Sequence, residues 1–277
     1  MQRIAFALAV VFLAVSAVIA QDQGPGPTLP SIPVAVRSQA YCTGFIASPS
    51  VPRDLVVVGG ADDDFHSVVR QFVQGESIYT SQPKGGSVAV GNEYSVVRPA
   101  DELFLTMRYQ GERWDIRKSG KPYEDVAQVR VTHVNPEGIV AKVTFSCGPV
   151  VPGDILVPLQ PRPDPTYTVS PPLDHFIPMD KGKEHGRVTA TNNNFGFFGR
   201  ETVVYLNLGE KTGTQPGNRF RIYKILPGHT TGVLAGERTP PEIIGEAVVL
   251  SVQSKSCVAM VVSSYREISS GDYVEKE

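Results

Sequence analysis

Valine-rich runs separated by short polar breaks dominate the pattern of apolar and polar positions along the chain. Residues 245–264, GEAVVLSVQSKSCVAMVVSS, hold two such runs around one polar break, which is typical of a β-hairpin. A second break, NPEG at 135–138, predicts a tight turn, because proline presets φ and glycine relieves a strained position. The pattern therefore predicts short strands over most of the chain.

One segment, 62–72, has a pattern that predicts a helix instead. Its apolar side chains recur at helical spacing and share one face: Phe65, Val68, Val69 and Phe72. Three aspartates, Asp62–Asp64, precede that face beside His66. Since no D-x-D-x-D-G loop is present, we interpret them as helix caps rather than as calcium ligands.

The chain also repeats itself. VPGDILVP at 151–158 has a counterpart in SSGDYVEK at 269–276, and the whole segment 126–154 aligns without a gap on 244–272. Three further matches need gaps: 88–98 with 214–224, 75–81 with 200–208, and CTGFI at 42–46 with EHGRV at 184–188. This self-similarity predicts one unit present twice, with insertions in the first copy.

The recurring Gly-Asn and Gly-Asp pairs each precede a short alternating run. We interpret them as turns that need φ > 0, where glycine adopts the conformation without strain and the Asn or Asp side chain bonds back to the backbone. Ligand contacts are the alternative reading of the same pairs.

About six strands per copy are predicted, and closing them into a barrel removes unpaired sheet edges. The expected fold class is all-β, with two small β-barrels in tandem, related by internal duplication. The segments are a signal peptide (1–20), an extended lead-in (21–37), a first barrel unit with insertions (38–158), a proline-rich linker (159–183) and a second barrel unit (184–277).

Export is predicted from residues 1–20, where Arg3 precedes an unbroken apolar run and small residues mark a cleavage site. A retained membrane anchor is the alternative, but the run is short for a membrane span. Cleavage removes Arg3 alone among the charged residues, so the net charge of −2 becomes −3. A nearly neutral chain has no overall field that attracts nucleic acid or anionic lipid. We expect a periplasmic or secreted protein with no transmembrane anchor after signal removal.

Three cysteines remain in an oxidising compartment, which allows one disulfide and leaves one thiol. Cys42 and Cys147 lie near the first and last strands of the first unit, which a closed barrel brings together, so we expect a bridge between them. Cys257 falls in a hairpin of the second unit and is expected to be a buried thiol. No spacing of cysteine and histidine suggests zinc, and we expect neither a metal nor another cofactor.

The motifs G-x-I/V, V-Y, V-x-x-G-N/D-x-[YF], G-E-x-V-V-x-x-V, A-x-V-x-x-S and G-D-x-[LV] follow one another in the chain. In this order they resemble the C-terminal domain of flagellar assembly protein T. They also resemble the unit that follows LysM peptidoglycan-binding modules in exported bacterial proteins. The resemblance is good over 184–277 and looser over 41–158. It implies an envelope-associated β module, whereas a flagellar role does not carry over because the chain has no LysM segment and no further flagellar-type domain.

Two segments are candidate binding sites. The first is the insertion 104–123, where rings lie among guanidinium donors, a combination that suits sugars, anionic polymers or single-stranded nucleic acid: Arg108, Tyr109, Arg113, Trp114 and Arg117. In an exported protein we favour a cell-wall glycan over nucleic acid. The alternative is a protruding hairpin with a solvated basic face that packs Trp114 on the barrel. The second segment is the glycine-broken tip at 192–200, where Phe195, Phe197 and Phe198 form a partner patch if exposed or plug a barrel end if buried.

No motif for catalysis is present: the five histidines are scattered, and there is no G-x-S-x-G, H-E-x-x-H or phosphate loop. We therefore expect a non-catalytic binding or assembly module of the bacterial cell envelope, with peptidoglycan or another envelope protein as partner and no nucleic acid. The alternatives are a cell-wall hydrolase with an unrecognised site and a purely structural envelope subunit.

Overall fold

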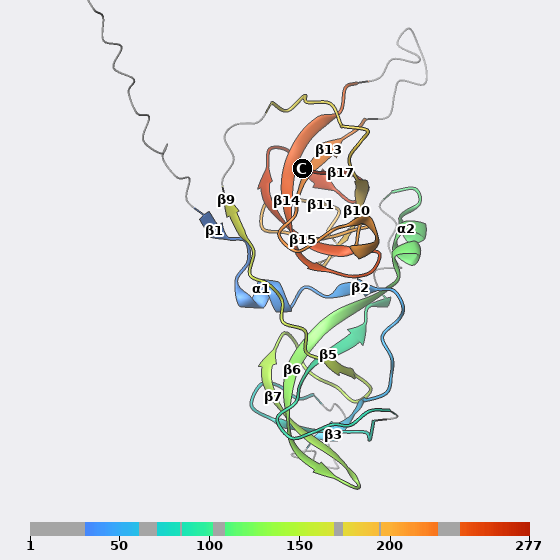
Figure 1. Ribbon diagram of the computed structural model, residues 1–277, viewed down its shortest axis with the longest axis vertical. Helices are drawn as coiled ribbons and strands as arrows, with labels where there is room; N and C mark the ends of the chain where they lie inside the picture. Colours follow the sequence, from blue (N-terminus) through green and yellow to red (C-terminus); the bar gives the residue numbers. More distant parts are fainter. Residues whose placement is uncertain are drawn as a thin grey trace, which may run out of the picture. The chain divides into compact units, whose positions relative to one another are not determined.

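Strands hold far more residues than helices in the computed structural model, which confirms the predicted β character of the fold (Figure 1). The structure describes residues 31–60, 71–83, 85–101, 109–168, 174–193, 195–226 and 239–277. The predicted signal peptide 1–20, most of the helix predicted for 62–72, and Arg108 lie outside the described residues. Residues 31–277 form one compact unit.

A closed barrel of six antiparallel strands occupies the C-terminal half. Its strands are β10 (His185–Thr191), β12 (Val203–Leu206), β13 (Arg219–Lys224), β14 (Glu242–Val252), β15 (Cys257–Ser264) and β17 (Tyr273–Lys276). They pair in the order β10-β12-β15-β14-β13-β17. The hairpin predicted for 245–264 is confirmed as β14 paired with β15. Two short strands, β11 (Phe197–Phe198) and β16 (Ile268–Ser269), pair separately.

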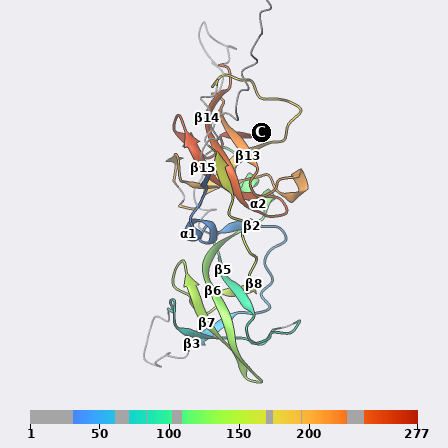
Figure 2. The ribbon, with the colours of Figure 1, turned by 60° about the vertical axis from the view of Figure 1, so that its left-hand side comes forward.

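The N-terminal half holds a seven-stranded sheet. Its strands are β2 (Phe45–Ala47), β3 (Val57–Gly60), β4 (Ser77–Thr80), β5 (Glu93–Pro99), β6 (Lys121–Asn135), β7 (Gly138–Ser146) and β8 (Ile155–Pro158). Six of them pair in the order β3-β4-β7-β6-β5-β8. If the strands of each half are numbered along the chain, this is the same order as in the barrel. Figure 2 shows β5, β6 and β7 side by side. Hydrogen bonds also join its two ends, from Val57 N–H to Asp154 O (2.9 Å) and from Leu156 N–H to Leu55 O (2.9 Å).

The first-strand match in the sequence comparison, 42–46 with 184–188, is wrong. β2 pairs with residues 121–123 of β6, whereas β10 pairs with β12 and β17. The physical reason is the length of β6, because β7 pairs only with its residues 127–135 and leaves an open edge that β2 takes. In the strand order, β3 has the position that β10 has in the barrel.

The predicted turns at the Gly-Asn and Gly-Asp pairs are confirmed. All four glycines have positive φ: Gly91 (92°), Gly153 (96°), Gly217 (83°) and Gly271 (97°). Each following side chain accepts the N–H of the residue three positions before it: Ala89 to Asn92 (2.8 Å), Val151 to Asp154 (2.9 Å), Gln215 to Asn218 (2.9 Å) and Ser269 to Asp272 (2.8 Å).

Both aspartates of these turns also bind a cation from a neighbouring strand. Arg98 on β5 lies 2.7 Å from Asp154, and Lys224 on β13 lies 2.8 Å from Asp272. The two aspartates are largely buried, so each needs such a partner. Each Gly-Asp pair therefore forms a turn and also supplies the carboxylate of an ion pair.

Two helices that the sequence does not predict are present. The structure describes α1 (Arg37–Tyr41) and α2 (Glu112–Ser119), and α2 replaces the hairpin expected within 104–123. α2 buries Glu112, Ile116 and Ser119, which recur at helical spacing. It ends at Gly120 (φ 143°), where a Cβ atom would lie 2.1 Å from the carbonyl oxygen of Ala47, so only glycine fits there.

The proline-rich linker and the lead-in are parts of the same folded unit. β9 (Thr166–Thr168) of the linker pairs with β1 (Ser31–Pro33) of the lead-in. Arg162 forms an ion pair with Asp125 at 2.8 Å and donates to the carbonyl oxygen of Ala40 at 2.7 Å. The linker is therefore fastened to the first half.

Three apolar clusters form the core. One lies inside the barrel, and the second is formed by residues of the N-terminal sheet and of the segments next to it. The third, which we call the junction cluster, joins residues of both halves, among them Phe45, Ile46, Tyr123, Ile116, Val203, Tyr205, Leu250 and Met260. Two hydrogen bonds of 2.6 Å add to it, from the Tyr205 hydroxyl to Thr43 O and from the Ser256 hydroxyl to Ile46 O. The halves therefore share buried surface as well as a chain connection.

Candidate functional site

An aromatic side chain surrounded by cations lies on the exposed side of α2. Trp114 is 63% exposed, and Arg113, Arg117 and Lys118 are exposed beside it; we call these four residues the α2 face. The Lys118 ammonium lies 4.8 Å from the centroid of the Trp114 ring, a cation–π distance. The structure thus brings together three of the five residues predicted for this site.

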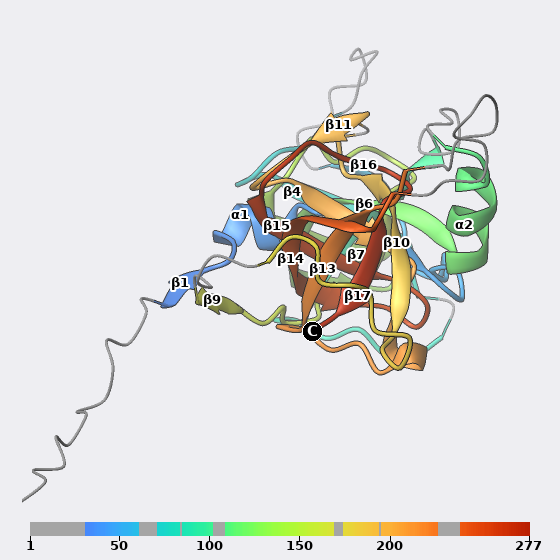
Figure 3. The same cartoon turned by 90° about the horizontal axis from the view of Figure 1, so that it is seen from above.

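The buried side of α2 explains why this face is presented to solvent. Ile116 is fully buried in the junction cluster and fixes the helix between β2, β6 and β10. Figure 3 shows α2 beside β10. Because Ile116 holds the helix, Trp114 and Arg117 point away from the core and their exposure does not depend on a loop conformation.

Tyr109 supports the helix and does not belong to the α2 face. Its hydroxyl donates to the Asp115 carboxylate at 2.8 Å, and its ring packs so closely on the turn before β17 that a Cβ atom on Gly271 would lie 2.9 Å from Cγ of Tyr109. Burial and the bond to Asp115 raise the pKa of Tyr109 above its ordinary value. Tyr109 therefore stays neutral and links α2 to the barrel.

A hollow of about 210 Å³ lies next to the α2 face. Its lining comes from α2, from the end of β12, from the 3-10 turn η2 (Glu210–Thr212) and from the turn between β14 and β15: Asp115, Lys118, Ser119, Asn207, Gly209, Lys211, Thr212 and Lys255. Three lysines therefore face one depression, which we call the lysine hollow.

Backbone contacts hold two of these lysines in place. Glu210 N–H donates to Gln253 O (3.0 Å) and Lys211 N–H donates to Ser254 O (3.1 Å). The two segments pack so tightly that a Cβ atom on Gly209 would lie 2.4 Å from Gln253 O. Sequence reasoning missed Lys211 and Lys255, because they are far from α2 in the chain and neither belongs to a motif.

The second predicted site is divided by the structure. Phe198 is buried in the barrel core, whereas Phe195 and Phe197 are exposed at 54% and 67%. β11 pairs with β16 and holds Phe197 outward beside a buried Phe198, as alternation along a strand requires. The patch is therefore smaller than the three residues predicted.

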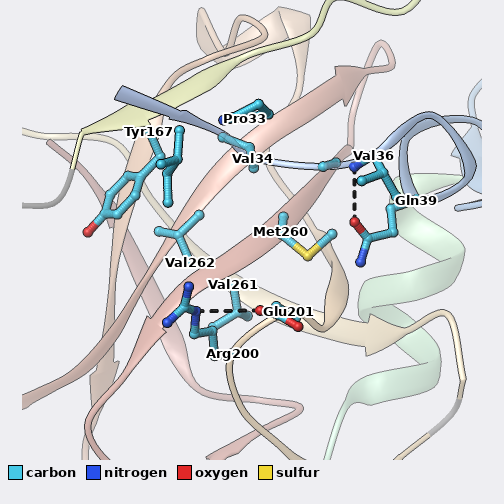
Figure 4. Close-up of a pocket in the computed structure, with 12 residues that line it drawn as sticks. Pro33, Val34, Val36, Gln39, Tyr167, Arg200, Glu201, Met260, Val261 and Val262 are labelled. Atoms are coloured by element: carbon cyan, nitrogen blue, oxygen red, sulfur yellow. Dashed lines mark hydrogen bonds and ion pairs between the residues drawn. The ribbon is translucent and has the colours of Figure 1, made fainter. Parts of the chain in front are cut away.

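A groove of about 360 Å³ lies along β15, beside β1 and β9 (Figure 4). Val34, Met260 and Val262 line it with Tyr167, and Arg200 forms an ion pair with Glu201 at 3.7 Å. Most of the residues that line the groove are apolar, and Arg200 and Glu201 pair with each other. This arrangement offers packing surface but no converging acid, base or nucleophile.

A cavity of about 750 Å³ has several prolines in its lining. They come from the segments around β2, β8 and β13 and from the linker: Pro49, Pro52, Pro158, Pro161, Pro163 and Pro216. Its charged pair, Arg162 with Asp125, already serves to fix the linker.

The cysteines and the metal-ligating residues show no sign of chemistry in the described part of the chain. Cys42 and Cys147 form a disulfide, and Cys257 is a buried thiol whose pKa is raised by burial. Within the described ranges, no three histidine, cysteine, aspartate or glutamate residues gather as metal ligands would. Nor does any helix of these ranges have the length and apolar character needed to cross a membrane.

Comparison with known proteins does not assign the chain to a family. None of the protein-family models matches the sequence, and a search of curated proteins gives no match either. The α2 face and the lysine hollow are the features of the structure that bear on function.

Proposed function

We propose that this protein is a non-catalytic, exported binding module of the bacterial cell envelope that holds a cell-wall glycan on the α2 face. The observation that carries the proposal is Trp114, the single tryptophan of the chain, which is 63% exposed on a firmly packed helix among Arg113, Arg117 and Lys118. Most of this side chain is in contact with solvent, so the ring contributes little to the core. Tryptophan and arginine are among the residues enriched where binding energy is concentrated at protein interfaces.

The chemistry of the α2 face suits a sugar polymer. An indole ring offers a flat apolar surface to the C–H face of a sugar, and guanidinium groups donate hydrogen bonds to hydroxyl or carboxylate oxygens. Because α2 is packed on a sheet, the ring is pre-organised and little conformational entropy is lost on binding.

We further propose that the two halves are copies of one β-barrel unit. The common strand order, the four equivalent Gly-Asn and Gly-Asp turns, and the paired cations of Asp154 and Asp272 support this. The resemblance to the C-terminal domain of flagellar assembly protein T and to the LysM-associated unit supports an envelope location. Export through the signal peptide 1–20 belongs to the same proposal.

A sedimentation assay with purified peptidoglycan tests the glycan-binding function. We expect the wild-type protein to sediment with the polymer and Trp114→Ala/Arg117→Ala to remain in solution. The matched control is Phe197→Ala/Arg200→Ala, which removes an exposed aromatic ring and an exposed arginine from the barrel. This control is expected to sediment like the wild type. Equal retention of all three proteins, or of none, would overturn the proposal.

A structural role in an envelope assembly is the second candidate, favoured by the exposure of Phe195 and Phe197. It predicts a stable oligomer that Phe197→Ala weakens. Analytical ultracentrifugation checks this, and a monomer at micromolar concentration excludes self-assembly through the patch.

A further inference from the structure

We infer that the lysine hollow binds the anionic group of an acidic glycan whose neighbouring sugar lies on Trp114. This inference rests on the proposed function and deepens it, because it names the class of polymer. It also adds Lys211 and Lys255, two residues of the second half, to a site that the sequence placed in the first half alone.

Unbalanced charge is the first argument. Lys118, Lys211 and Lys255 line the hollow with a single carboxylate, that of Asp115. Within the described residues, none of these three ammonium groups forms an ion pair. Other cations of the molecule do find partners: Arg98, Arg162 and Lys224 each lie within 2.8 Å of an aspartate. Clustered cations in a concave surface attract an anion, and binding one relieves their mutual repulsion.

Continuity between the hollow and the α2 face is the second argument. Lys118 belongs to both, since this residue lines the hollow and its ammonium lies over the Trp114 ring. A ligand with an acidic group next to an apolar ring face therefore matches the two surfaces together. A uronic acid or a phosphate-bearing sugar has this combination, whereas a neutral sugar would leave the three lysines unused.

Neutral polar groups around the hollow fit a sugar as well. Asn207 Oδ1 accepts the N–H of Arg187 at 2.7 Å, so the amide nitrogen is the group that Asn207 can offer to a ligand oxygen. Asp115 binds Tyr109 through Oδ2, and its other oxygen can accept a sugar hydroxyl. A site for inorganic anions alone would have no use for a carboxylate.

Single-stranded nucleic acid fits these surfaces less well. Its binding proteins stack successive bases on several aromatic rings along a basic groove. The α2 face offers one exposed ring, and the net charge of −2 gives no long-range attraction for a polyanion of that charge density. An acidic polysaccharide, with a lower charge density and a ring for Trp114, is the better match.

The test measures binding of the full secreted chain to three immobilised polymers and to single-stranded DNA. The polymers are polygalacturonate, which carries carboxylates, a glycosylated glycerol-phosphate polymer and neutral chitin. The variant is Lys211→Glu/Lys255→Glu, and Lys142→Glu/Lys181→Glu is its control, because it makes the same change of charge at exposed lysines elsewhere. Thermal unfolding of both variants checks that the fold is intact.

We expect the wild type to bind at least one acidic polymer. The hollow variant is expected to bind this polymer at least about tenfold more weakly, because like charges at a contact oppose binding strongly. The affinity of the control variant is expected to change by less than about twofold, because its substitutions lie outside the hollow. The carboxylate and phosphate arms identify the acidic group. Equal loss in both variants, equal binding of chitin, or tighter binding of DNA would each overturn the inference. Peptidoglycan retention that is lost in Trp114→Ala/Arg117→Ala but normal in the hollow variant, with no acidic polymer bound, would leave the proposed function standing alone.

Discussion

Single side chains with several partners hold distant segments of this protein together, and Arg162 is the main example. Its guanidinium binds the Asp125 carboxylate (2.8 Å), Ala40 O (2.7 Å) and the Thr43 hydroxyl (2.9 Å). Its backbone N–H donates to the Tyr41 hydroxyl at 3.0 Å. One residue of the linker thus fixes α1 and β6 at the same time.

Replacing Arg162 tests this role. Arg162→Met leaves the Asp125 carboxylate, which is 5% exposed, buried without its cation, so the free energy of unfolding is expected to fall by about 3 kcal/mol. Arg130→Met is the matched control, since the Arg130–Glu93 pair is exposed on both sides and is expected to contribute less than about 1 kcal/mol. Urea denaturation measures both changes, and equal losses would contradict the assignment.

The buried thiol of Cys257 makes stability depend on alkaline pH. Burial raises its pKa in the folded state, whereas the unfolded chain has an ordinary thiol with a pKa of about 8.5. Below that pH both states are protonated and the contribution to stability is complete. Above it the unfolded state loses a proton that the folded state keeps, so the free energy of unfolding falls as pH rises.

Between pH 9 and 10, Cys257→Ala is therefore expected to flatten this fall by up to about 1.4 kcal/mol per pH unit. Urea denaturation at several pH values checks the difference between variant and wild type. Parallel curves would show that the thiol ionises in the folded protein as readily as in the unfolded one.

At the scale of single residues, the sequence predicts turns that depend on neighbouring residues, but not contacts between residues that lie far apart in the chain. The turns at Gly153 and Gly271 follow from two adjacent residues, so the sequence predicts them. The partners of Arg162 lie 37 or more positions away, and no sequence pattern signals them. For the same reason no sequence pattern signals Lys211 and Lys255, although they share a hollow with Lys118.

At the scale of elements, strands were easier to predict than the helix that carries the candidate site. Valine-rich alternation identifies β6, β7, β14 and β15 because a half-buried strand needs it. α2 buries Glu112 and Ser119 beside Ile116, so two of its three buried positions are polar and an apolar period is missing. A basic, tryptophan-containing segment therefore resembled an exposed hairpin.

The disulfide joins elements that lie far apart in the chain. Cys42 follows α1 and Cys147 follows β7, with a sequence separation of 105. Because the bridge restricts a long loop in the unfolded chain, Cys42→Ser/Cys147→Ser is expected to lower the free energy of unfolding by about 2–5 kcal/mol. Urea denaturation measures the loss, and reduction of the wild type should reproduce it. A change below about 0.5 kcal/mol would mean that the fold does not depend on this bridge.

On the scale of the whole molecule, the junction cluster limits how far the two halves are independent. Each half buries a cluster of its own, as expected from their lengths, but Tyr205, Leu250 and Met260 of the barrel are covered by residues of the first half. The sequence comparison detected what the halves have in common. It had no means to detect the contact between them, since that surface differs from one half to the other.

We expect this shared surface to make unfolding a single cooperative transition. Trp114 fluorescence reports on α2, and far-ultraviolet circular dichroism reports on all strands, so the two signals are expected to change at the same urea concentration. Met260→Ala removes buried volume at the junction and is expected to shift both midpoints together. Two separated transitions would instead indicate halves that unfold independently.

Both halves of the molecule contribute residues to the lysine hollow. Lys118 comes from the first half, whereas Lys211 and Lys255 come from the second. If the two halves arose by duplication of one ancestral unit, a single unit lacked this hollow, and the hollow formed only when two units were joined. A substitution that weakens the junction cluster is then expected to weaken binding of the proposed polymer as well, because it lets the three ammonium groups move apart.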